Sequence, residues 1–481
     1  MTYTDGKLLI GGQFAEASGG RRFDCINPAT EEVIGSAPDA GRAEMEAAIA
    51  AARTAADTTG WSADIEFRRH CLAQLQQVCR DYADTWRHEL VAETGTPIMW
   101  THLFQLDWTI DFGLGTPLRL MDAYEWEIDR GVHDGARRTV LKRPIGVVGA
   151  IIPWNFPVEI TMSKLGPIIA TGNTVVIKAA PDTPLNSLRL GELAAQTDLP
   201  PGVINIITSS DHLVGETLAG SPDIDLVAFT GSTATGRRVM EVAARNITKV
   251  FLELGGKSAS ILLDDADFPA ALGGSVMTCI HAGQGCALPT RLLVPRSRYD
   301  EALQILEAVW RRIPFGDPTD PANMAGPLIS AAQRDRVLAH IARGVDEGAR
   351  LLVGGGRPDG FDTGFYVEPT LFVDVDNSMT IAQEEIFGPV LAVIPHDGDD
   401  DAVRIANDSV YGLSGSVASA DQARGESVAR RIRTGTIDVN GAVGYRCEMP
   451  FGGHKHSGIG RQWGVEGFDE LMELTSLSTP A

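Results

Sequence analysis

The chain has 481 residues, more than one ordinary hydrophobic core, which favours about three domains or subdomains. Its composition, with 44% hydrophobic residues and 52 glycines, is typical of a globular enzyme, and its net charge of −22 would repel nucleic-acid phosphates and anionic lipids. No apolar run is long enough for a secretion signal or a membrane span, so we expect a cytoplasmic protein without nucleic-acid or membrane partners.

The cysteines do not indicate a disulfide framework or a metal site. They are scattered through a chain without an export signal, and neither CxxC nor paired Cys/His spacing occurs. We therefore expect free thiols and no bound metal. The six are Cys25, Cys71, Cys79, Cys279, Cys286 and Cys447.

The first part of the chain predicts a hairpin followed by helices. KLLIGGQFAEA, residues 7–17, places glycines between two short apolar runs, and residues 27–38 continue as loop and strand. Residues 43–56 and 64–92 carry apolar side chains at spacings of three and four, which predicts amphipathic helices.

Two later regions alternate short apolar runs with helical patterns. The first covers residues 143–252 and the second residues 253–440. Alternation at this spacing predicts parallel sheets with helices on their faces, so we expect two α/β domains, the first of which is a candidate nucleotide-binding domain.

Residues 122–144 alternate like a hairpin that belongs to neither sheet, and the tail ELMELTSLS has a similar strand pattern. Exposed strands pair readily with another chain, so both segments could form an assembly element.

VAFTGSTATGR, residues 227–237, is a strand, a glycine turn and a helix start. Backbone N–H groups at a helix start favour an anion, and Ser232 could add a hydroxyl donor. The spacing is neither GxGxxG nor a Walker A motif, and this architecture is also common without a ligand.

Two further motifs follow predicted strands. In NTVVIKAAPDTP, Lys178 lies at the carboxyl end of a strand, where it could reach a ribose hydroxyl or a phosphate; it could equally be a surface lysine. In IIPWNFP, the Asn155 amide could donate to a developing oxyanion, although a loop asparagine is usually a turn residue.

Two acidic motifs allow similar alternatives. Glu253 in FLELGGKSASILL could act as a general base at the junction of the two α/β regions, or be an ordinary surface glutamate. In EEIFGPV, Glu385 could accept hydrogen bonds from sugar hydroxyls and Phe387 could pack on a flat ring, or the motif could be a charged cap before a strand.

HAGQGCALPTR, residues 281–291, places Cys286 between a glycine and a proline-containing turn. Small neighbours leave room for a substrate at a nucleophilic thiolate, but they also suit any tight loop. The local sequence leaves both readings open.

Taken together, these motifs resemble those of the aldehyde dehydrogenase superfamily. PWNFP, the lysine at the strand end, FTGST, ELGGKS, GQxC, EEIFGPV and PFGGHKHSGIGR at 450–461 occur in that family's order and at compatible spacings. The resemblance runs from one end of the chain to the other.

The resemblance implies a reaction. Cys286 would attack the aldehyde carbonyl, Asn155 with the Cys286 backbone N–H would stabilise the oxyanion, and hydride would leave to a nicotinamide. Glu253 would then activate water to hydrolyse the thioester, so that the product is a carboxylic acid.

The resemblance also implies a dinucleotide site, with NAD as the expected cofactor. Many members that prefer NAD carry a glutamate three residues after the strand-end lysine; here that position is Pro181, so NADP is also possible. The implied contacts are Lys178 to the adenosine ribose, Trp154 and Ser232 to the pyrophosphate, Glu385 and Phe387 at the nicotinamide ribose, and Pro153, Gly215 and Gly231 along the approach.

The implied fold is α/β, with two Rossmann-like parallel-sheet domains and a protruding β oligomerisation element. Family members usually form homodimers or homotetramers through this element. The expected division is a cofactor-binding domain at 1–121 and 145–252, a catalytic domain at 253–440, and an oligomerisation element with the C-terminal tail at 122–144 and 441–481.

Two alternatives stay open. A CoA-acylating dehydrogenase would use the same cysteine, but such members often lack the ELGG glutamate; an inactive binding protein would have lost the nucleophile, the oxyanion asparagine or the base. For the substrate, Phe156, residues 107–112 with Trp108, and His281 hint at a hydrophobic or aromatic aldehyde, although core packing would explain the same residues.

Overall fold

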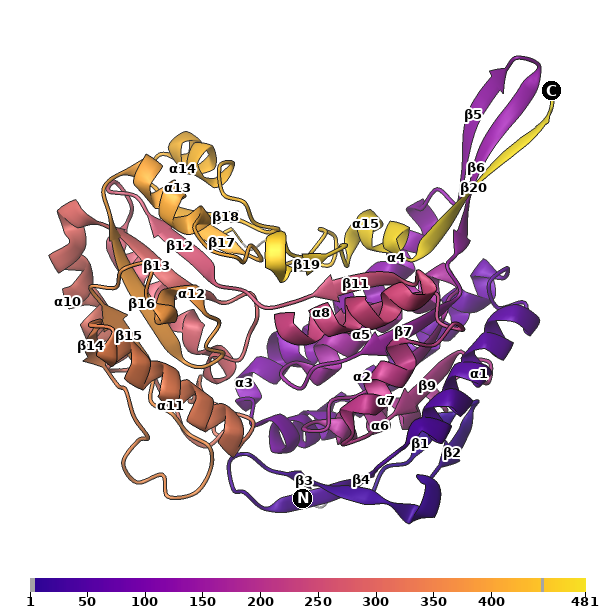
Figure 1. Ribbon diagram of the computed structural model, residues 1–481, viewed down its shortest axis with the longest axis horizontal. Helices are drawn as coiled ribbons and strands as arrows, with labels where there is room; N and C mark the ends of the chain where they lie inside the picture. Colours follow the sequence, from indigo (N-terminus) through magenta and orange to yellow (C-terminus); the bar gives the residue numbers. More distant parts are fainter. Residues whose placement is uncertain (1–4, 443–444) are drawn as a thin grey trace.

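The computed structural model describes residues 5–442 and 445–481. Figure 1 shows two α/β lobes, one built around each parallel sheet, and a β arm that projects from the lobe containing the first sheet. This confirms the fold class expected from the sequence.

The first sheet, here the cofactor sheet, is parallel in its centre. β7, β8 and β9 follow one another to one side, and β10 and β11 lie on the other side of β7. Short antiparallel strands extend both edges. Its order is β19 (Gly458–Ile459), β11 (Lys249–Glu253), β10 (Leu226–Thr230), β7 (Val147–Ile151), β8 (Thr174–Lys178), β9 (Ile204–Ile207), β1 (Leu8–Ile10) and β2 (Gln13–Ala15).

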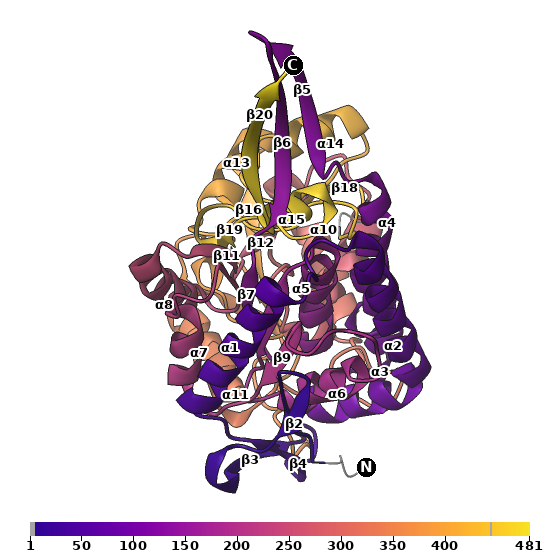
Figure 2. The same ribbon diagram turned by 90° about the vertical axis from the view of Figure 1, so that its right-hand side faces the viewer.

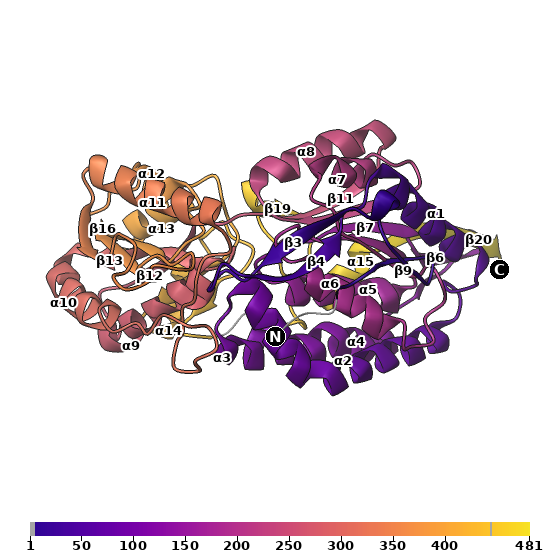
Figure 3. The same cartoon turned by 90° about the horizontal axis from the view of Figure 1, so that it is seen from below.

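Helices cover the faces of this sheet, as Figure 3 shows from below. The most buried is α5 (Pro157–Thr171), which begins at Pro157, where the missing N–H costs nothing, and ends before Gly172 in the left-handed region. The others are α1 (Arg42–Thr58), α2 (Ile65–Thr94), α3 (Ile98–Trp100), α4 (Gly115–Ala123), α6 (Pro184–Ala194), α7 (His212–Ala219), α8 (Thr233–Ala243) and α15 (Gly464–Glu470).

The second sheet, here the catalytic sheet, repeats the parallel design from β12 onward. Its order is β14 (Arg350–Val353), β15 (Thr370–Val373), β16 (Val390–His396), β13 (Pro289–Pro295), β12 (Ser258–Leu262), β17 (Gly415–Ala418) and β18 (Asp438–Val439). Its helices are α9 (Phe268–Gly273), α10 (Tyr299–Trp310), α11 (Ala331–Asp346), α12 (Thr380–Gln383), α13 (Asp399–Asn407) and α14 (Gln422–Ala429).

The arm is a separate antiparallel sheet that leaves the body of the molecule (Figure 2). β5 (Glu127–His133) and β6 (Ala136–Pro144) form the hairpin expected at 122–144, and β20 (Met472–Pro480) pairs with β6 along its whole length. Another hairpin, β3 (Arg22–Ile26) with β4 (Val33–Pro38), lies near the N-terminus.

The segment before β20 packs against the cofactor sheet and its helices. β19 pairs with β11 at the edge of the cofactor sheet, and α15 packs against α5. Phe468 and Leu471 are buried in the same hydrophobic core as α5 and β8. The C-terminal residues therefore complete the cofactor sheet before they enter the arm.

Candidate active site

The candidate site lies where the carboxyl ends of the strands of the first sheet meet the amino ends of the strands of the second sheet. Ile151 of β7 is in register with Lys178 of β8 and with Phe229 of β10, and Thr230 is in register with Glu253 of β11. These carboxyl-end positions therefore form one continuous edge. The chain order reverses between β7 and β10, and such a reversal is where open α/β sheets bind nucleotides.

The catalytic sheet contributes the start of its strands. The chain passes from Glu253 through Gly255 and Gly256 into β12, and Cys286 directly precedes β13. A Cβ on Gly255 would collide with the carboxylate of Glu385, and one on Gly256 would collide with the Cys286 carbonyl oxygen. Only glycine allows this close approach, which is the physical reason for the two glycines of ELGG.

Cys286 contacts Glu253 across the junction. Its Sγ donates to Glu253 Oε2 over 3.7 Å, and the side chain is partly exposed, whereas Cys25, Cys71 and Cys79 are buried in the core. The thiol predicted to be the nucleophile thus lies beside the carboxylate predicted to be the base.

Burial sets the protonation of this pair. Burial, the largest cause, and the nearby carboxylate of Glu253 raise the pKa of Cys286 well above its usual value. Burial also raises the pKa of Glu253 to about 8, against the opposing charge of Lys164. At neutral pH most Glu253 carboxyl groups are therefore protonated, and only the ionised fraction, which grows as the pH rises, can take the proton of the thiol.

Asn155 is anchored to the cysteine loop. It is buried, and its Nδ2 donates a hydrogen bond to the Gln284 carbonyl over 2.8 Å. The Gln284 side chain in turn accepts from the Ile329 N–H over 2.9 Å. A primary amide has two N–H groups, so the second stays available for an oxyanion next to Cys286.

Glu385 approaches the same junction from the loop before β16. Its Oε1 accepts from the Gly256 N–H over 3.0 Å, and burial raises the pKa of Glu385 to about 7. Nearby, Trp154 and Phe387 meet edge to face with ring centroids 5.4 Å apart, and Phe387 has φ +59°. The Trp154 and Phe387 rings therefore lie side by side just beyond the end of β7, and Pro153 directly precedes Trp154.

Lys178 lies at the other end of the candidate nucleotide site. It is buried, its Nζ donates to the Ser209 carbonyl over 3.3 Å, and burial lowers the pKa of Lys178 to about 8. The charges of Asp182, Asp211 and Asp39 oppose this fall. A cation surrounded by three carboxylates suits a neutral hydroxyl ligand better than a phosphate.

The turn after β10 opens helix α8. Ser232 is the N-cap: its Oγ accepts from the Thr235 N–H over 3.2 Å and shares a hydrogen bond with the Thr235 hydroxyl over 2.9 Å, and this polar pair lies at the helix start, where an anion is favoured. The Gly231 N–H donates to the Glu253 carbonyl over 3.1 Å. Gly215 belongs to α7, and a Cβ there would meet nothing closer than Ile151, 4.0 Å away.

The residues suggested for the aldehyde side fall into two groups. Trp108 and Phe112 stack at 5.5 Å and, like Cys286, pack against the hydrophobic cluster around Leu413 and Trp463. Phe156 contacts the ring of His281 edge to face, and burial lowers the pKa of His281 to about 3, so that ring is neutral. Asp107 instead bonds Arg87, at 2.9 and 3.1 Å, and is a structural ion pair.

The sequence analysis did not single out several charged or polar residues around the site. Glu159 and Lys164 belong to α5, Lys257 follows the ELGG glycines, and Tyr445 lies in the loop before β19. A usable signal existed: in PVEITMSKLGPIIA, one acid and one base interrupt a helix that is otherwise apolar, and charged residues are almost never fully buried without a role or a partner.

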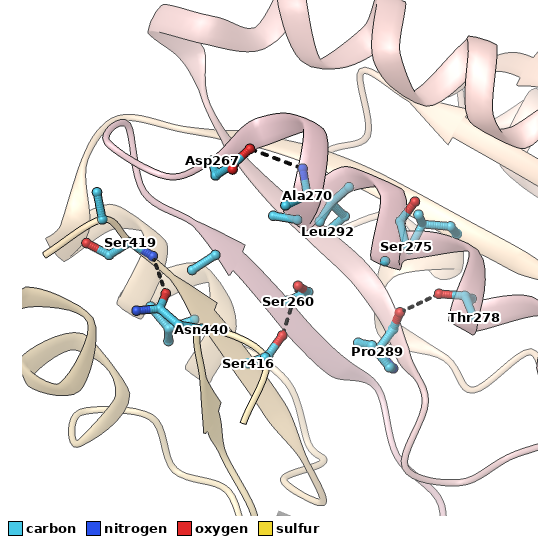
Figure 4. A pocket seen from close by; sticks show the side chains of 17 residues that line it. Ser260, Asp267, Ala270, Ser275, Thr278, Pro289, Leu292, Ser416, Ser419 and Asn440 are labelled. Carbon is cyan, nitrogen blue, oxygen red and sulfur yellow. Dashed lines mark hydrogen bonds between the residues drawn. The ribbon is translucent and has the colours of Figure 1, made fainter. Parts of the chain in front are cut away.

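A separate cavity of about 460 Å³ lies on the catalytic domain (Figure 4). The polar groups in it bond one another: Ser416 to Ser260 at 2.9 Å, the Ser419 N–H to Asn440 at 2.9 Å, and Thr278 to the Pro289 carbonyl at 2.9 Å. It holds neither Cys286 nor Glu253, so we do not assign the chemistry to it.

Within residues 5–442 and 445–481, no helix combines the length and apolar character that crossing a bilayer requires. Over the same residues, no group of three or more His, Cys, Asp or Glu side chains is arranged to hold a metal ion.

Comparison with known proteins agrees with this geometry. The model of the aldehyde dehydrogenase family matches residues 14–477. The chain is 41% identical to geranial dehydrogenase of Castellaniella defragrans, over 99% of both chains, and 40% identical to 3-succinoylsemialdehyde-pyridine dehydrogenase of a Pseudomonas species, over 98% of both.

A crystal structure of Mycobacterium tuberculosis aldehyde dehydrogenase complexed with NAD+ is also similar. It has a TM-score of 0.97 and 42% identity, and the match covers 100% of this chain and 99% of that one. The chain belongs to the aldehyde dehydrogenase family.

Proposed function

We propose that the protein oxidises an aldehyde to the carboxylic acid with NAD, using Cys286 as nucleophile, Glu253 as base and Asn155 as oxyanion donor. The observation that carries this assignment is the 3.7 Å contact between the Cys286 thiol and the Glu253 carboxylate at the meeting of the two sheet edges. The family assignment supports it.

The first step is addition to the aldehyde. Glu253 removes the thiol proton, and the Cys286 sulfur bonds to the carbonyl carbon. The oxygen that becomes negative accepts hydrogen bonds from the free Asn155 amide N–H and from the Cys286 backbone N–H. Because the site is largely buried, these donors are worth more than they would be in water.

The residues at the carboxyl edge of the cofactor sheet fit a dinucleotide. Lys178 offers a buried ammonium, Ser232 an exposed hydroxyl at a helix start, and Glu385 a buried acceptor. The Trp154 and Phe387 rings adjoin this edge. Pro153, Gly215 and Gly231 line the approach to this edge, and Gly215 leaves it open, because a Cβ there would meet nothing closer than Ile151 at 4.0 Å. When bound, NAD supplies the hydride acceptor.

Hydrolysis of the resulting thioester completes the reaction. Glu253, whose pKa burial raises to about 8, first passes the thiol proton to solvent and can then take a proton from a water molecule that attacks the acyl carbon. The sulfur of Cys286 leaves as thiolate and recovers a proton from Glu253. The carboxylic acid is released. The presence of Glu253 favours water over coenzyme A as the acyl acceptor.

NAD is the proposed cofactor despite Pro181. The charges of Asp182, Asp211 and Asp39 all act on Lys178, and carboxylates in that position repel a 2′-phosphate. The similar crystal structure that holds NAD+ supports this choice.

We also propose a homodimer or homotetramer built on the arm. β20 is exposed along nearly its whole length, including Leu474 and Leu477, and β18 is the edge strand of the catalytic sheet. Exposed edges of this kind are covered when a second copy pairs with them. Gel filtration that shows a monomer at micromolar concentration would contradict this assembly.

The test is NADH formation with a panel of aliphatic, aromatic and terpenoid aldehydes, with product analysis in the presence and absence of coenzyme A. We expect a carboxylic acid whether or not coenzyme A is present. An acyl-CoA product would replace hydrolysis with acyl transfer, and no turnover of any aldehyde by folded protein that binds NAD would refute the function.

A further inference from the structure

Glu159 is a buried carboxyl group that the proposed reaction does not use. It lies in the first turn of α5, a helix with every residue buried, and its own exposure is 3%. Carboxylates are rarely buried to this degree unless they are paired or have a function. Its surroundings therefore need an explanation.

Its partners hold only one of its two oxygens. Ser163 Oγ donates to Oε1 over 2.8 Å, and the Tyr445 hydroxyl donates to the same oxygen over 3.0 Å. No residue in the described parts of the chain donates to Oε2. Oε2 is not among the fully enclosed unpaired polar atoms of the described residues, so this oxygen keeps a slight contact with solvent.

Tyr445, which bonds Glu159, lies among the aromatic residues that pack near Cys286. The Tyr445 ring stacks with Trp108 at 5.6 Å and meets Trp463 at 4.6 Å. Tyr445 and Trp108 pack, together with Cys286, against one small hydrophobic cluster. Through its hydrogen bond to Tyr445, the Glu159 carboxyl group therefore adjoins the aromatic residues that pack near Cys286.

The electrostatics agree with this placement. Burial is the largest cause of the raised pKa of Cys286, of Glu253 and of Tyr445. The negative charge of Glu159 raises the pKa of each of the three further. Burial raises the pKa of Glu159 itself to about 7, while its two hydrogen bonds and Lys164 oppose the rise. The group is therefore able to accept a hydrogen bond near neutral pH.

We propose that Glu159 determines substrate specificity: its free Oε2 accepts a hydrogen bond from a hydroxyl or protonated amino group of an aldehyde whose apolar or aromatic body packs on Trp108 and Tyr445. This inference rests on the proposed function. It changes the expectation from a purely hydrophobic aldehyde to one that also carries a donor.

The physical basis is the asymmetry of buried hydrogen bonds. A site that holds an acceptor in place binds the matching donor and rejects an analogue without it, because the analogue leaves the acceptor desolvated and unpaired. Tyr445 and Ser163 fix the carboxyl group by its other oxygen, so Oε2 cannot turn away to find a different partner.

The experiment compares para-(hydroxymethyl)benzaldehyde with para-ethylbenzaldehyde, which has the same number of heavy atoms, and with the larger para-(dimethylaminomethyl)benzaldehyde, which carries a protonated amine. The methylene group insulates the aldehyde from the electronic effect of each substituent. We expect kcat/KM of the native protein to be about tenfold higher for at least one donor-bearing aldehyde than for the ethyl compound. Equal values for all three would overturn the proposal.

Glu159→Leu should reduce that preference about tenfold or more, mainly through KM for the donor-bearing aldehyde. An equal fall for all three aldehydes would instead show that Glu159 is only structural, and would overturn the proposal. Glu93→Gln is the matched control, since Glu93 is a fully buried carboxyl in the same domain that bonds Leu185 and Asn186, and it should keep the preference.

Glu159→Gln serves if the leucine variant does not fold. It keeps the shape and an acceptor oxygen but not the charge, so we expect it to lower kcat/KM about tenfold for the ammonium aldehyde and less than threefold for the hydroxymethyl compound. Equal effects on both would overturn the proposal. Failure of the native protein to oxidise these three while it oxidises other aldehydes of the panel would also overturn the proposal, whereas failure with every aldehyde of the panel would count against the proposed function.

Discussion

The two parallel sheets of the molecule resemble each other in design but face the active site with opposite edges. The cofactor sheet presents strand ends, where Lys178 and Glu253 lie. The catalytic sheet presents strand beginnings, because Cys286 precedes β13 and Glu385 precedes β16. At its far edge, the buried His396 bonds the Leu262 carbonyl over 2.9 Å, and the proposed reaction uses neither residue.

This difference teaches where a general rule holds. Open α/β sheets bind ligands beyond the carboxyl ends of their strands, and the cofactor sheet follows that rule. In the proposed mechanism, the catalytic sheet would supply its chemistry from the amino ends of its strands, which the short ELGG connection brings against the first sheet. The proposed site therefore combines residues from the strand ends of one sheet with residues from the strand beginnings of the other. Substitutions of the catalytic residues should abolish turnover without abolishing NAD binding.

The largest effect is expected from the catalytic edge. Cys286→Ala removes the nucleophile and should lower kcat at least about a thousandfold, while NAD binding measured by calorimetry is retained. Cys79→Ala is the matched control, because Cys79 is buried in α2 far from the chemistry. Substantial turnover by the Cys286 variant would end the assignment of the nucleophile.

Glu253→Gln removes the base at the carboxyl edge of the cofactor sheet. Steady turnover should fall about a hundredfold to ten-thousandfold, with a burst of NADH if thioester hydrolysis has become the slow step. The pH profile sharpens this test. Because burial raises the pKa of Glu253 to about 8 and that of Cys286 further, kcat/KM of the native protein should rise with pH through that region as the pair loses its proton.

A native profile that falls from pH 7 to 9, measured under conditions where the protein stays folded, would contradict this protonation scheme. The glutamine variant should lose the part of the profile that belongs to the carboxyl group. Retention of the same profile by Glu253→Gln would assign the titration to another residue.

Asn155 joins the two edges, since it follows β7 and bonds the loop of the nucleophile. Asn155→Ala should reduce kcat about a hundredfold to a thousandfold by removing an oxyanion donor. The cofactor edge should still bind NAD. A rise in KM for the aldehyde with unchanged kcat would show that the amide positions the substrate and does not stabilise the oxyanion.

The smallest effect is expected for the choice between NAD and NADP, which depends on residues at the strand ends of the cofactor sheet. Asp182→Asn should raise kcat/KM for NADP relative to NAD by about twofold to fivefold, because it removes one of the charges near Lys178. Asp300→Asn, an exposed carboxylate on the other domain, is the control. A strong preference of the native protein for NADP would overturn NAD as the cofactor.

The sequence predicted the fold class well, because alternating apolar runs and helical periods report parallel sheets directly. It also placed the hairpin of the arm, and the structure confirms both. β14 and α11 were not anticipated, since their strand and helix signals lie among charged residues at 331–353.

The residues of the candidate site differ in how readily the sequence points to them, depending on the sheet to which they belong. Lys178 could be singled out from its strand end, whereas Cys286 and Glu385 lie in loops before strands and depended on the family resemblance. Glu159 and Tyr445 were missed because their meeting joins residues 286 positions apart, a contact that no local pattern encodes.

The position of β20 has a consequence for biosynthesis. Its pairing partner β6 is synthesised long before Met472–Pro480, so β6 presents an unpaired edge until β20 has been made. A chain cut within β20 would keep Asn155, Glu253 and Cys286 but would leave that edge open. We therefore expect such a truncation to cause aggregation before it alters the chemistry.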